Sequence, residues 1–122
     1  MKNILIIGGT KGIGKAIVEQ LVNENIVICM SRNSTEFSHN NYTHTTFDST
    51  VDELPDVEKV DTLIYCPGSI NLKPISTLSI DDFRKDFEIN VIGAVKVIKK
   101  YIPLLKKGLN PSILLFSTVA TK

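Results

Sequence analysis

Residues 3–14 read Asn-Ile-Leu-Ile-Ile-Gly-Gly-Thr-Lys-Gly-Ile-Gly, and this stretch decides the fold. A short apolar run that ends at turn residues is typical of a β-strand buried on both faces. Behind the glycines, apolar side chains recur every three or four positions through Val22, which predicts an amphipathic helix. The apolar positions of this predicted helix are Ile13, Ala16, Ile17 and Leu21.

Strands alternate with helical or loop segments along the rest of the chain. Further runs of apolar or β-branched residues predict strands at residues 26–30, 42–47, 60–65 and 112–116, and residues 33–42 are polar enough for a loop. Such apolar strands are too hydrophobic to face water, so the pattern predicts an α/β fold with a parallel sheet.

A long helix precedes the last predicted strand. Ser79 is followed by Asp81 and Asp82, which is an N-terminal capping signal with carboxylates in the first turn. The helix should run to about Lys107, before Gly108. Its apolar stripe, expected to be buried, consists of Phe83, Phe87, Val91, Ala94, Ile98 and Ile102.

Composition excludes several classes of protein. The 122 residues suit one domain, and 14 Lys and Arg against 13 Asp and Glu argue against nucleic-acid or membrane-surface partners. No apolar run approaches the roughly 18 residues of a membrane span. Two cysteines, Cys29 and Cys66, make neither a disulfide framework nor a CxxC motif, so we expect the reducing cytoplasm.

The glycine cluster allows four interpretations. A P-loop fits at Gly9, Gly14 and Lys15, but Ala16 stands where a Ser or Thr should bind magnesium. A receiver-like domain needs acidic metal ligands after its first strand, where this chain has glycines, and we predict no metal site. A tight turn with no ligand requires fewer than four glycines in seven residues. The remaining interpretation is a dinucleotide-binding loop, in which backbone amides at a helix N-terminus approach phosphate.

The spacing Gly8-x-x-x-Gly12-x-Gly14, with its flanking sequence, resembles the T-G-x-x-x-G-x-G motif of the short-chain dehydrogenase/reductase family, with Ile7 in place of the usual Thr. The resemblance extends over the whole chain. It implies a Rossmann-like, doubly wound parallel sheet of strand order 3-2-1-4-5 in three αβα layers, without the family's last strands and helices. It also implies cofactor contacts from Gly8, Gly9, Thr10, Lys11, Gly12, Ile13 and Gly14.

The end of the second predicted strand bears on cofactor choice. Ser31 and Arg32 follow it, and no Asp or Glu lies between Ile26 and Thr35. A carboxylate here would bind the ribose 2′-hydroxyl of NAD, whereas an Arg accommodates the 2′-phosphate of NADP. Together with the cation of Lys11, this pattern favours NADP(H) over NAD(H). The alternative for Arg32 is an ordinary solvated charge.

Two further positions belong to the implied cofactor site. Asp48 matches the family position that touches the adenine, although a turn cap is an equally open interpretation. Residues 65–68 read Tyr-Cys-Pro-Gly where the family has N-N-A-G, so Cys66 and Gly68 should lie against the cofactor. Only Gly68 is retained, and Tyr65 cannot be assumed to replace the first Asn.

The catalytic set implied by the resemblance is only partly present. Asn90 matches the Asn of the family's long helix, which holds a water in the proton relay. Thr118 stands at the catalytic Ser position, and Ser117 would take it if the register slips by one. The family's Tyr-x-x-x-Lys centre is missing, because none of the three tyrosines has a Lys four residues later.

Two explanations of the missing centre stay open. We expect residues 1–122 to be an NAD(P)-binding domain that is incomplete at its C-terminus, from an oxidoreductase acting on a small carbonyl or alcohol. For the full-length protein the resemblance implies a homo-oligomer. The alternative is a non-catalytic module that binds or senses NADP(H).

Overall fold

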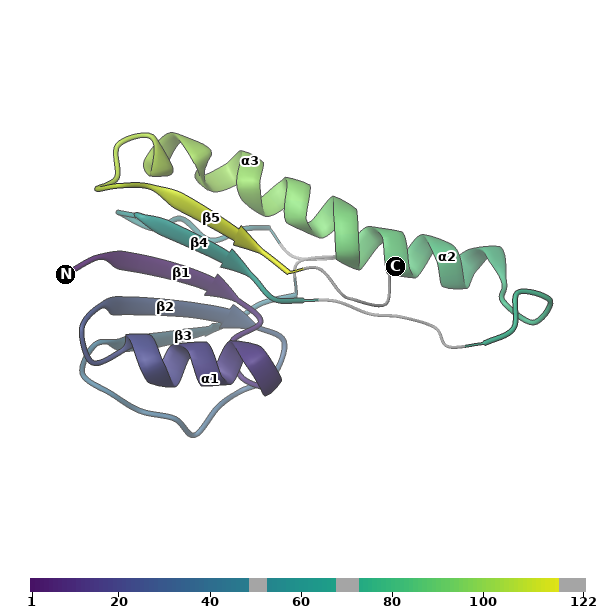
Figure 1. Ribbon diagram of the computed structural model, residues 1–122, viewed down its shortest axis with the longest axis horizontal. Helices are drawn as coiled ribbons and strands as arrows, with labels where there is room; N and C mark the ends of the chain where they lie inside the picture. Colours follow the sequence, from purple (N-terminus) through teal and green to yellow (C-terminus); the bar gives the residue numbers. More distant parts are fainter. Residues whose placement is uncertain (49–52, 68–72, 117–122) are drawn as a thin grey trace.

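The computed structural model describes residues 1–48, 53–67 and 73–116 of the chain. Within these ranges, five parallel strands form one sheet in the order β3-β2-β1-β4-β5 (Figure 1). The strands are β1 (Asn3–Ile7), β2 (Ile26–Ser31), β3 (Tyr42–Thr46), β4 (Thr62–Tyr65) and β5 (Ser112–Leu115). The predicted doubly wound parallel sheet is therefore confirmed.

Helices cover both faces of the sheet and complete the three αβα layers. α1 (Gly12–Leu21) lies on one face, and α2 (Ile80–Phe87), η1 (Glu88–Ile92) and α3 (Gly93–Leu105) follow one another on the other (Figure 1). Because neighbouring residues of a strand point to opposite faces, Ile6 packs in the α1 layer and Leu5 in the α3 layer. Among the described residues, no helix is both long enough and apolar enough to cross a membrane.

A loop, as predicted, connects β2 to β3 on the α1 face. Phe37 packs edge-on against Tyr42, with ring centroids 4.9 Å apart and planes at 89°. The side chain of Asn41 donates a hydrogen bond from Nδ2 to the carbonyl of Val22, 2.9 Å away. These contacts attach the loop to the sheet and to the end of α1 without an intervening helix.

The capping signal at residue 79 forms as predicted. The Ser79 hydroxyl accepts a hydrogen bond from the amide of Asp82 at 3.0 Å, and the Asp82 carboxylate accepts one from the amide of Ser79 at 3.1 Å. This reciprocal capping box satisfies two amides that would otherwise lack partners at the helix start.

The expected buried stripe of the long helix is wrong over most of its length. Phe83, Phe87 and Val91 are exposed, and Phe87 keeps 57% of its surface accessible. α2 extends past the carboxyl ends of the strands, where no sheet lies beneath it (Figure 1), and the π-helical η1 shifts the helical register before α3 begins. The face that is buried on the sheet consists of Gly93, Ala94, Val97, Tyr101 and Leu105.

The buried face of α1 also differs from the prediction. Gly14 and Val18 point into the core, whereas Ile13 is 65% exposed and Ala16 is exposed too. Gly14 lies directly against the backbone of Gly8 and Gly9. Ile13, the residue before it, therefore faces outward.

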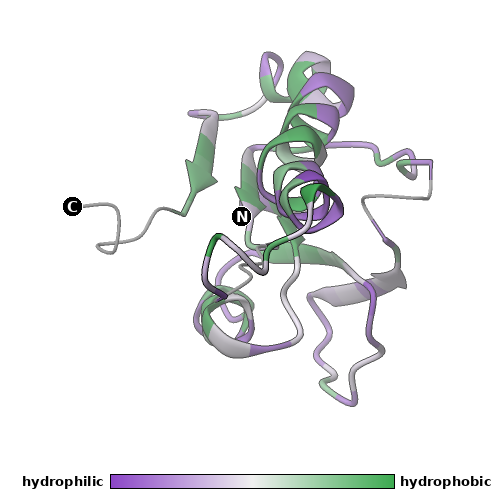
Figure 2. Ribbon diagram, turned by 90° about the vertical axis from the view of Figure 1, so that its right-hand side faces the viewer, coloured by the Kyte–Doolittle hydropathy of each residue, from purple (hydrophilic) through white to green (hydrophobic). Residues whose placement is uncertain are grey.

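β5 forms an apolar edge of the sheet. Its side chains are all exposed, including Ile113, Leu114 and Leu115, and Figure 2 shows the hydrophobic colour of most of this arrow. An apolar edge strand offers unpaired backbone groups to another strand.

Asp61 ties the amino-terminal ends of three strands together. Its Oδ2 accepts a hydrogen bond from the amide of Asn3 at 2.7 Å, and its Oδ1 accepts one from the amide of Leu109 at 2.7 Å. Gly108 makes this possible, because a Cβ there would lie 2.9 Å from the carbonyl oxygen of Val60. The hydrogen bond from the Asn3 amide, followed by that from the Leu109 amide, lowers the pKa of Asp61 from its ordinary value of 3.8.

We predict that Asp61→Ala lowers the free energy of unfolding by about 2–4 kcal/mol, since two amides lose a charged acceptor. Because the folded pKa is lowered, the contribution of Asp61 is complete above the unfolded pKa and is lost as the pH falls through the folded pKa. The gap between wild type and Asp61→Asn, measured by urea unfolding, should therefore shrink from about pH 7 to about pH 3. Asp56→Ala, which removes a surface ion pair with Lys100, serves as the control with a small effect. An equal loss from both alanine variants would contradict the prediction.

Candidate cofactor site

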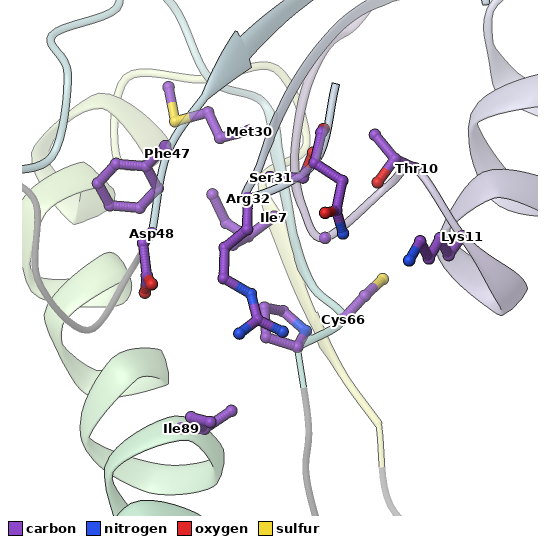
Figure 3. Close-up of a pocket in the computed structure, with 13 residues that line it drawn as sticks. Ile7, Thr10, Lys11, Met30, Ser31, Arg32, Phe47, Asp48, Cys66 and Ile89 are labelled. Atoms are coloured by element: carbon purple, nitrogen blue, oxygen red, sulfur yellow. The ribbon is translucent and has the colours of Figure 1, made fainter. Parts of the chain in front are cut away.

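Four strand ends meet at one cavity on the carboxyl edge of the sheet. The cavity has a volume of about 230 Å³ and lies at the point where the chain order reverses between β1 and β4. Sites for small molecules usually occupy about 300–1,000 Å³, so this cavity is large enough for part of a dinucleotide but not for all of it. Figure 3 shows its wall, which is made by Ile7, Gly8, Thr10, Lys11, Met30, Ser31, Arg32, Asn33, Phe47, Asp48, Cys66, Pro67 and Ile89.

Backbone hydrogen bonds hold the cavity wall beyond the strand ends. The amide of Gly8 donates to the carbonyl of Met30 at 2.8 Å, and the amide of Cys66 donates to the carbonyl of Ile7 at 2.9 Å. On the other side, the amide of Phe47 donates to the carbonyl of Ser31 at 2.7 Å. The sheet ladder thus continues into the loops, so the site rests on rigid backbone.

Two glycines of the loop adopt backbone angles that other residues rarely reach. Gly8 has φ of +82° and Gly12 has φ of +55°. These turns carry the chain out of β1 and into α1. Gly12 is open to solvent, with no heavy atom within 4 Å of the position of a Cβ.

The other two glycines allow close packing. A Cβ on Gly14 would lie 2.3 Å from the carbonyl oxygen of Gly8, and a Cβ on Gly9 would lie 2.8 Å from Sγ of Cys29. Neither distance is physically possible for a side-chain carbon. Gly9 and Gly14 therefore set the loop against the core and are absent from the cavity wall, as are Gly12 and Ile13.

The N-terminus of α1 opens at the glycine loop. Its N-cap residue Lys11 is extended, and no side chain of the described residues caps the first turn or places an acidic group there. The first amides of such a helix carry a partial positive charge and bind anions. Lys11 is exposed at the cavity, and in Figure 3 its ammonium group points toward the space between the strands. The amides at the start of α1 and the Lys11 ammonium are the kind of donors that bind a pyrophosphate.

The end of β2 brings Ser31 and Arg32 to the same cavity. Figure 3 shows the Arg32 guanidinium reaching into it from the β2 side, between Asp48 and Cys66. Asp48 follows β3 and forms the opposite part of the wall beside Phe47. Ser31, Arg32 and Asp48, the polar positions predicted from the sequence at these two strand ends, thus line one cavity.

The segment after β4 departs from the family pattern, and the structure shows what its residues contact. Cys66 is partly exposed in the cavity wall, and burial raises the pKa of its thiol to about 11, so the thiol stays protonated at neutral pH. Tyr65 is buried on the α3 face, and its hydroxyl donates to the carbonyl of Ile89 at 2.5 Å. Tyr65 is therefore a link between β4 and η1.

Asn90 lies on η1, where the helix widens to a π-helical turn. A π-helical turn leaves a carbonyl outside the regular hydrogen-bond ladder, and Tyr65 bonds the carbonyl of Ile89 in this turn. Asn90 therefore lies in an irregular turn of the helix. Asn90 itself is exposed, as are Phe87 and Val91.

Three sequence-predicted positions, Gly68, Ser117 and Thr118, lie outside the described residues. Their expected roles stay predictions.

Sequence reasoning missed the apolar part of the wall. Ile7, Met30, Phe47 and Ile89 line the cavity together with Asn33 and Pro67. The first three lie at or just after the ends of strands, so their apolar side chains look like ordinary core residues in the sequence. Their position at a carboxyl strand end is the signal that could have identified them.

The chain is similar to known oxidoreductases along almost its entire length. A model of the short chain dehydrogenase family matches residues 37–122. An uncharacterized oxidoreductase of Schizosaccharomyces pombe is 29% identical over 99% of this chain and 55% of its own length. The chain thus spans about half the length of the curated relative it matches.

Solved structures share the fold. A short chain dehydrogenase/reductase from Saccharomyces cerevisiae superposes with a TM-score of 0.85 at 22% identity, over 100% of this chain and 55% of that one. A short chain dehydrogenase from Leptospira borgpetersenii with bound NAD+ gives a TM-score of 0.83 at 22% identity, over 97% and 52%. Another similar structure, with a TM-score of 0.79 at 24% identity over 98% and 56%, has NADPH bound. With its parallel sheet, glycine loop and matching family model, this chain belongs to the short-chain dehydrogenase/reductase family.

Proposed function

We propose that this chain is the cofactor-binding part of an NADP(H)-dependent oxidoreductase, which transfers hydride between nicotinamide and a carbonyl or alcohol. The observation that carries the proposal is Arg32, which lines the cavity under the glycine loop while residues 26–35 contain no carboxylate. A guanidinium at the end of the second strand accommodates a 2′-phosphate, to which a carboxylate would be repulsive.

Each charged side chain of the cavity wall has one role in this proposal. The amides at the start of α1 and the ammonium of Lys11 hold the pyrophosphate. Arg32 binds the 2′-phosphate, and Asp48 contacts the adenine. The bound cofactor supplies the hydride.

On the substrate side, Thr118 or Ser117 holds the substrate oxygen through its hydroxyl. Asn90 positions a water for the proton relay. These roles rest on the family resemblance of the two segments.

The proton donor comes from outside residues 1–122 in this proposal, because the three tyrosines of the chain already serve the core. Tyr101 is fully buried, its hydroxyl donates to the carbonyl of Pro55 at 2.5 Å, and burial raises its pKa to about 12. The hydroxyl of Tyr65 bonds Ile89, and burial raises the pKa of Tyr42. A tyrosine that exchanges protons near neutral pH needs a lowered pKa and access to substrate.

The proposal extends to the compartment, the substrate and the assembly of the full-length protein. Both cysteines are free thiols, which supports a reducing cytoplasm. The substrate is a small carbonyl or alcohol, and the full-length protein assembles as a homo-oligomer, as the family resemblance implies.

Calorimetric titration of NADPH and NADH into the full-length protein tests the cofactor, and turnover on a panel of ketones and alcohols tests the reaction. We predict that NADPH binds at least roughly ten times more tightly, as expected for one charge-assisted contact to the 2′-phosphate. Equal affinities would overturn the cofactor assignment. Tight NADPH binding without turnover on any substrate would instead favour a sensing module.

A further inference from the structure

Ser31 has a buried hydroxyl with two hydrogen-bond partners beside the cavity. Only 6% of Ser31 is exposed. Its Oγ donates to the carbonyl of Asn33 at 2.9 Å and lies 2.8 Å from Nε2 of His44. A buried hydroxyl is costly unless it is paired, so both contacts matter to the local fold.

The direction of the hydrogen bond with His44 follows from counting protons. A serine hydroxyl has one hydrogen, and the Asn33 carbonyl can only accept, so that hydrogen is used there. Nε2 of His44 must therefore carry a proton and donate it to Ser31 Oγ. The two hydrogen bonds therefore run in one direction: the His44 imidazole donates to the Ser31 hydroxyl, which donates to the Asn33 carbonyl.

The position of His44 in the sheet keeps this pair of hydrogen bonds fixed. It lies on β3, the edge strand, where it is paired in register with Cys29 of β2. Its ring is half-buried on the α1 face, the same face on which Ser31 points. The imidazole thus comes from a fixed strand and reaches the point where β2 ends.

Beyond Ser31 the chain leaves the sheet. Arg32 and Asn33 are exposed, and both line the cavity. The hydrogen bond from Ser31 to the Asn33 carbonyl closes a tight turn around Arg32. The starting point and direction of the Arg32 side chain therefore depend on the Ser31 hydroxyl.

We propose that His44 is a specificity-determining positioning residue. By donating to Ser31 Oγ, it holds the turn that aims the Arg32 guanidinium at the 2′-phosphate of the cofactor. This inference rests on the proposed function and deepens it, since it assigns the preference for a 2′-phosphate to a residue outside the cavity.

The physical reason for an effect is preorganisation. The long arginine side chain loses rotamer freedom when it binds phosphate, and a fixed backbone reduces what must be ordered on binding. Loss of one hydrogen bond to the turn should weaken binding of a 2′-phosphate roughly three- to ten-fold. Ligands without that phosphate do not engage Arg32 and should be unaffected.

The test uses two ligands and two variants of the full-length protein. We expect His44→Leu to weaken adenosine 2′,5′-bisphosphate roughly three- to ten-fold in calorimetric titration, with adenosine 5′-monophosphate unchanged. His44→Gln, whose side-chain amide can donate from a similar position, should restore most of the affinity. His39→Leu removes the other imidazole of the chain, which accepts from the amide of Asn41, and should leave the ratio of affinities unchanged.

A double-mutant cycle separates positioning from general structure. In an Arg32→Gln background, His44→Leu should cost nothing further, because its effect passes through the guanidinium. Equal weakening of both ligands by His44→Leu, or an undiminished cost in the Arg32→Gln background, would overturn the proposal for His44 and leave the cofactor assignment intact. If the wild-type protein does not distinguish the two ligands, the proposed function itself fails.

Discussion

Arg32→Asp should invert the cofactor preference of the full-length protein, changing the NADPH-to-NADH affinity ratio by roughly 100-fold, or about 3 kcal/mol. The substitution removes a charge-assisted partner of the 2′-phosphate and places a repelling carboxylate at the same point. The new carboxylate can also accept from the ribose 2′-hydroxyl of NADH. Calorimetric titration of both cofactors into the variant measures the ratio directly.

The chain offers a matched control for this charge change. Arg84, its only other arginine, is exposed on α2, so Arg84→Asp makes the same change in net charge away from the cavity. A shift of similar size in both variants would show that long-range charge rather than contact sets the preference. A preference unaltered by Arg32→Asp would remove Arg32 from the site.

Gly14→Ala should destabilise the fold by roughly 3 kcal/mol or more and abolish measurable cofactor binding. Its Cβ would lie 2.3 Å from the carbonyl oxygen of Gly8 and 3.0 Å from Cα of Gly9. Both neighbours are backbone, so the helix and the loop must move apart, which disperses the amides at the anion site. Thermal unfolding and titration of NADPH measure the two consequences.

Gly12→Ala, two residues earlier, is the natural comparison. Nothing lies within 4 Å of a Cβ at Gly12, but its φ is +55°, so the cost should be only about 1 kcal/mol of backbone strain. Helix propensity alone would make Gly14→Ala stabilising by about 1 kcal/mol. A stabilised Gly14→Ala variant that still binds cofactor would therefore refute the close packing of loop and helix.

Much of the fold could be predicted because its signals are local. The apolar runs at residues 3–7 and 26–30 mark strands by composition, and the glycine loop marks the turn between strand and helix. The capping box at Ser79 is equally local, since both its hydrogen bonds join residues three apart. Arg32 could be placed near the site because carboxyl ends of parallel strands meet at one edge, whereas Asp48 was placed there by the family resemblance.

The errors arose where the outcome depends on distant packing. Phe87 and Val91 have the spacing of a buried stripe, but burial needs an element opposite them, and α2 extends beyond the sheet. A π-helical turn leaves no mark in apolar periodicity, so the change of face at Gly93 was hidden. The contact between His44 and Ser31 depends on strand register, which the sequence of an edge strand specifies weakly.

The order of the strands also governs how the protein acquires and keeps its shape. β1 pairs with β2 across a short stretch of chain, joining Ile4 to Val27, whereas its pairing with β4 joins Ile4 to Thr62. Loop-closure entropy opposes the longer connection more strongly, so we expect β1, β2 and β3 to form before β4 joins them. The part of the cavity wall that comes from the ends of β4 and η1 should then form later. We therefore expect a nucleotide bound there to stabilise contacts that form late, and so to slow unfolding rather than to speed folding.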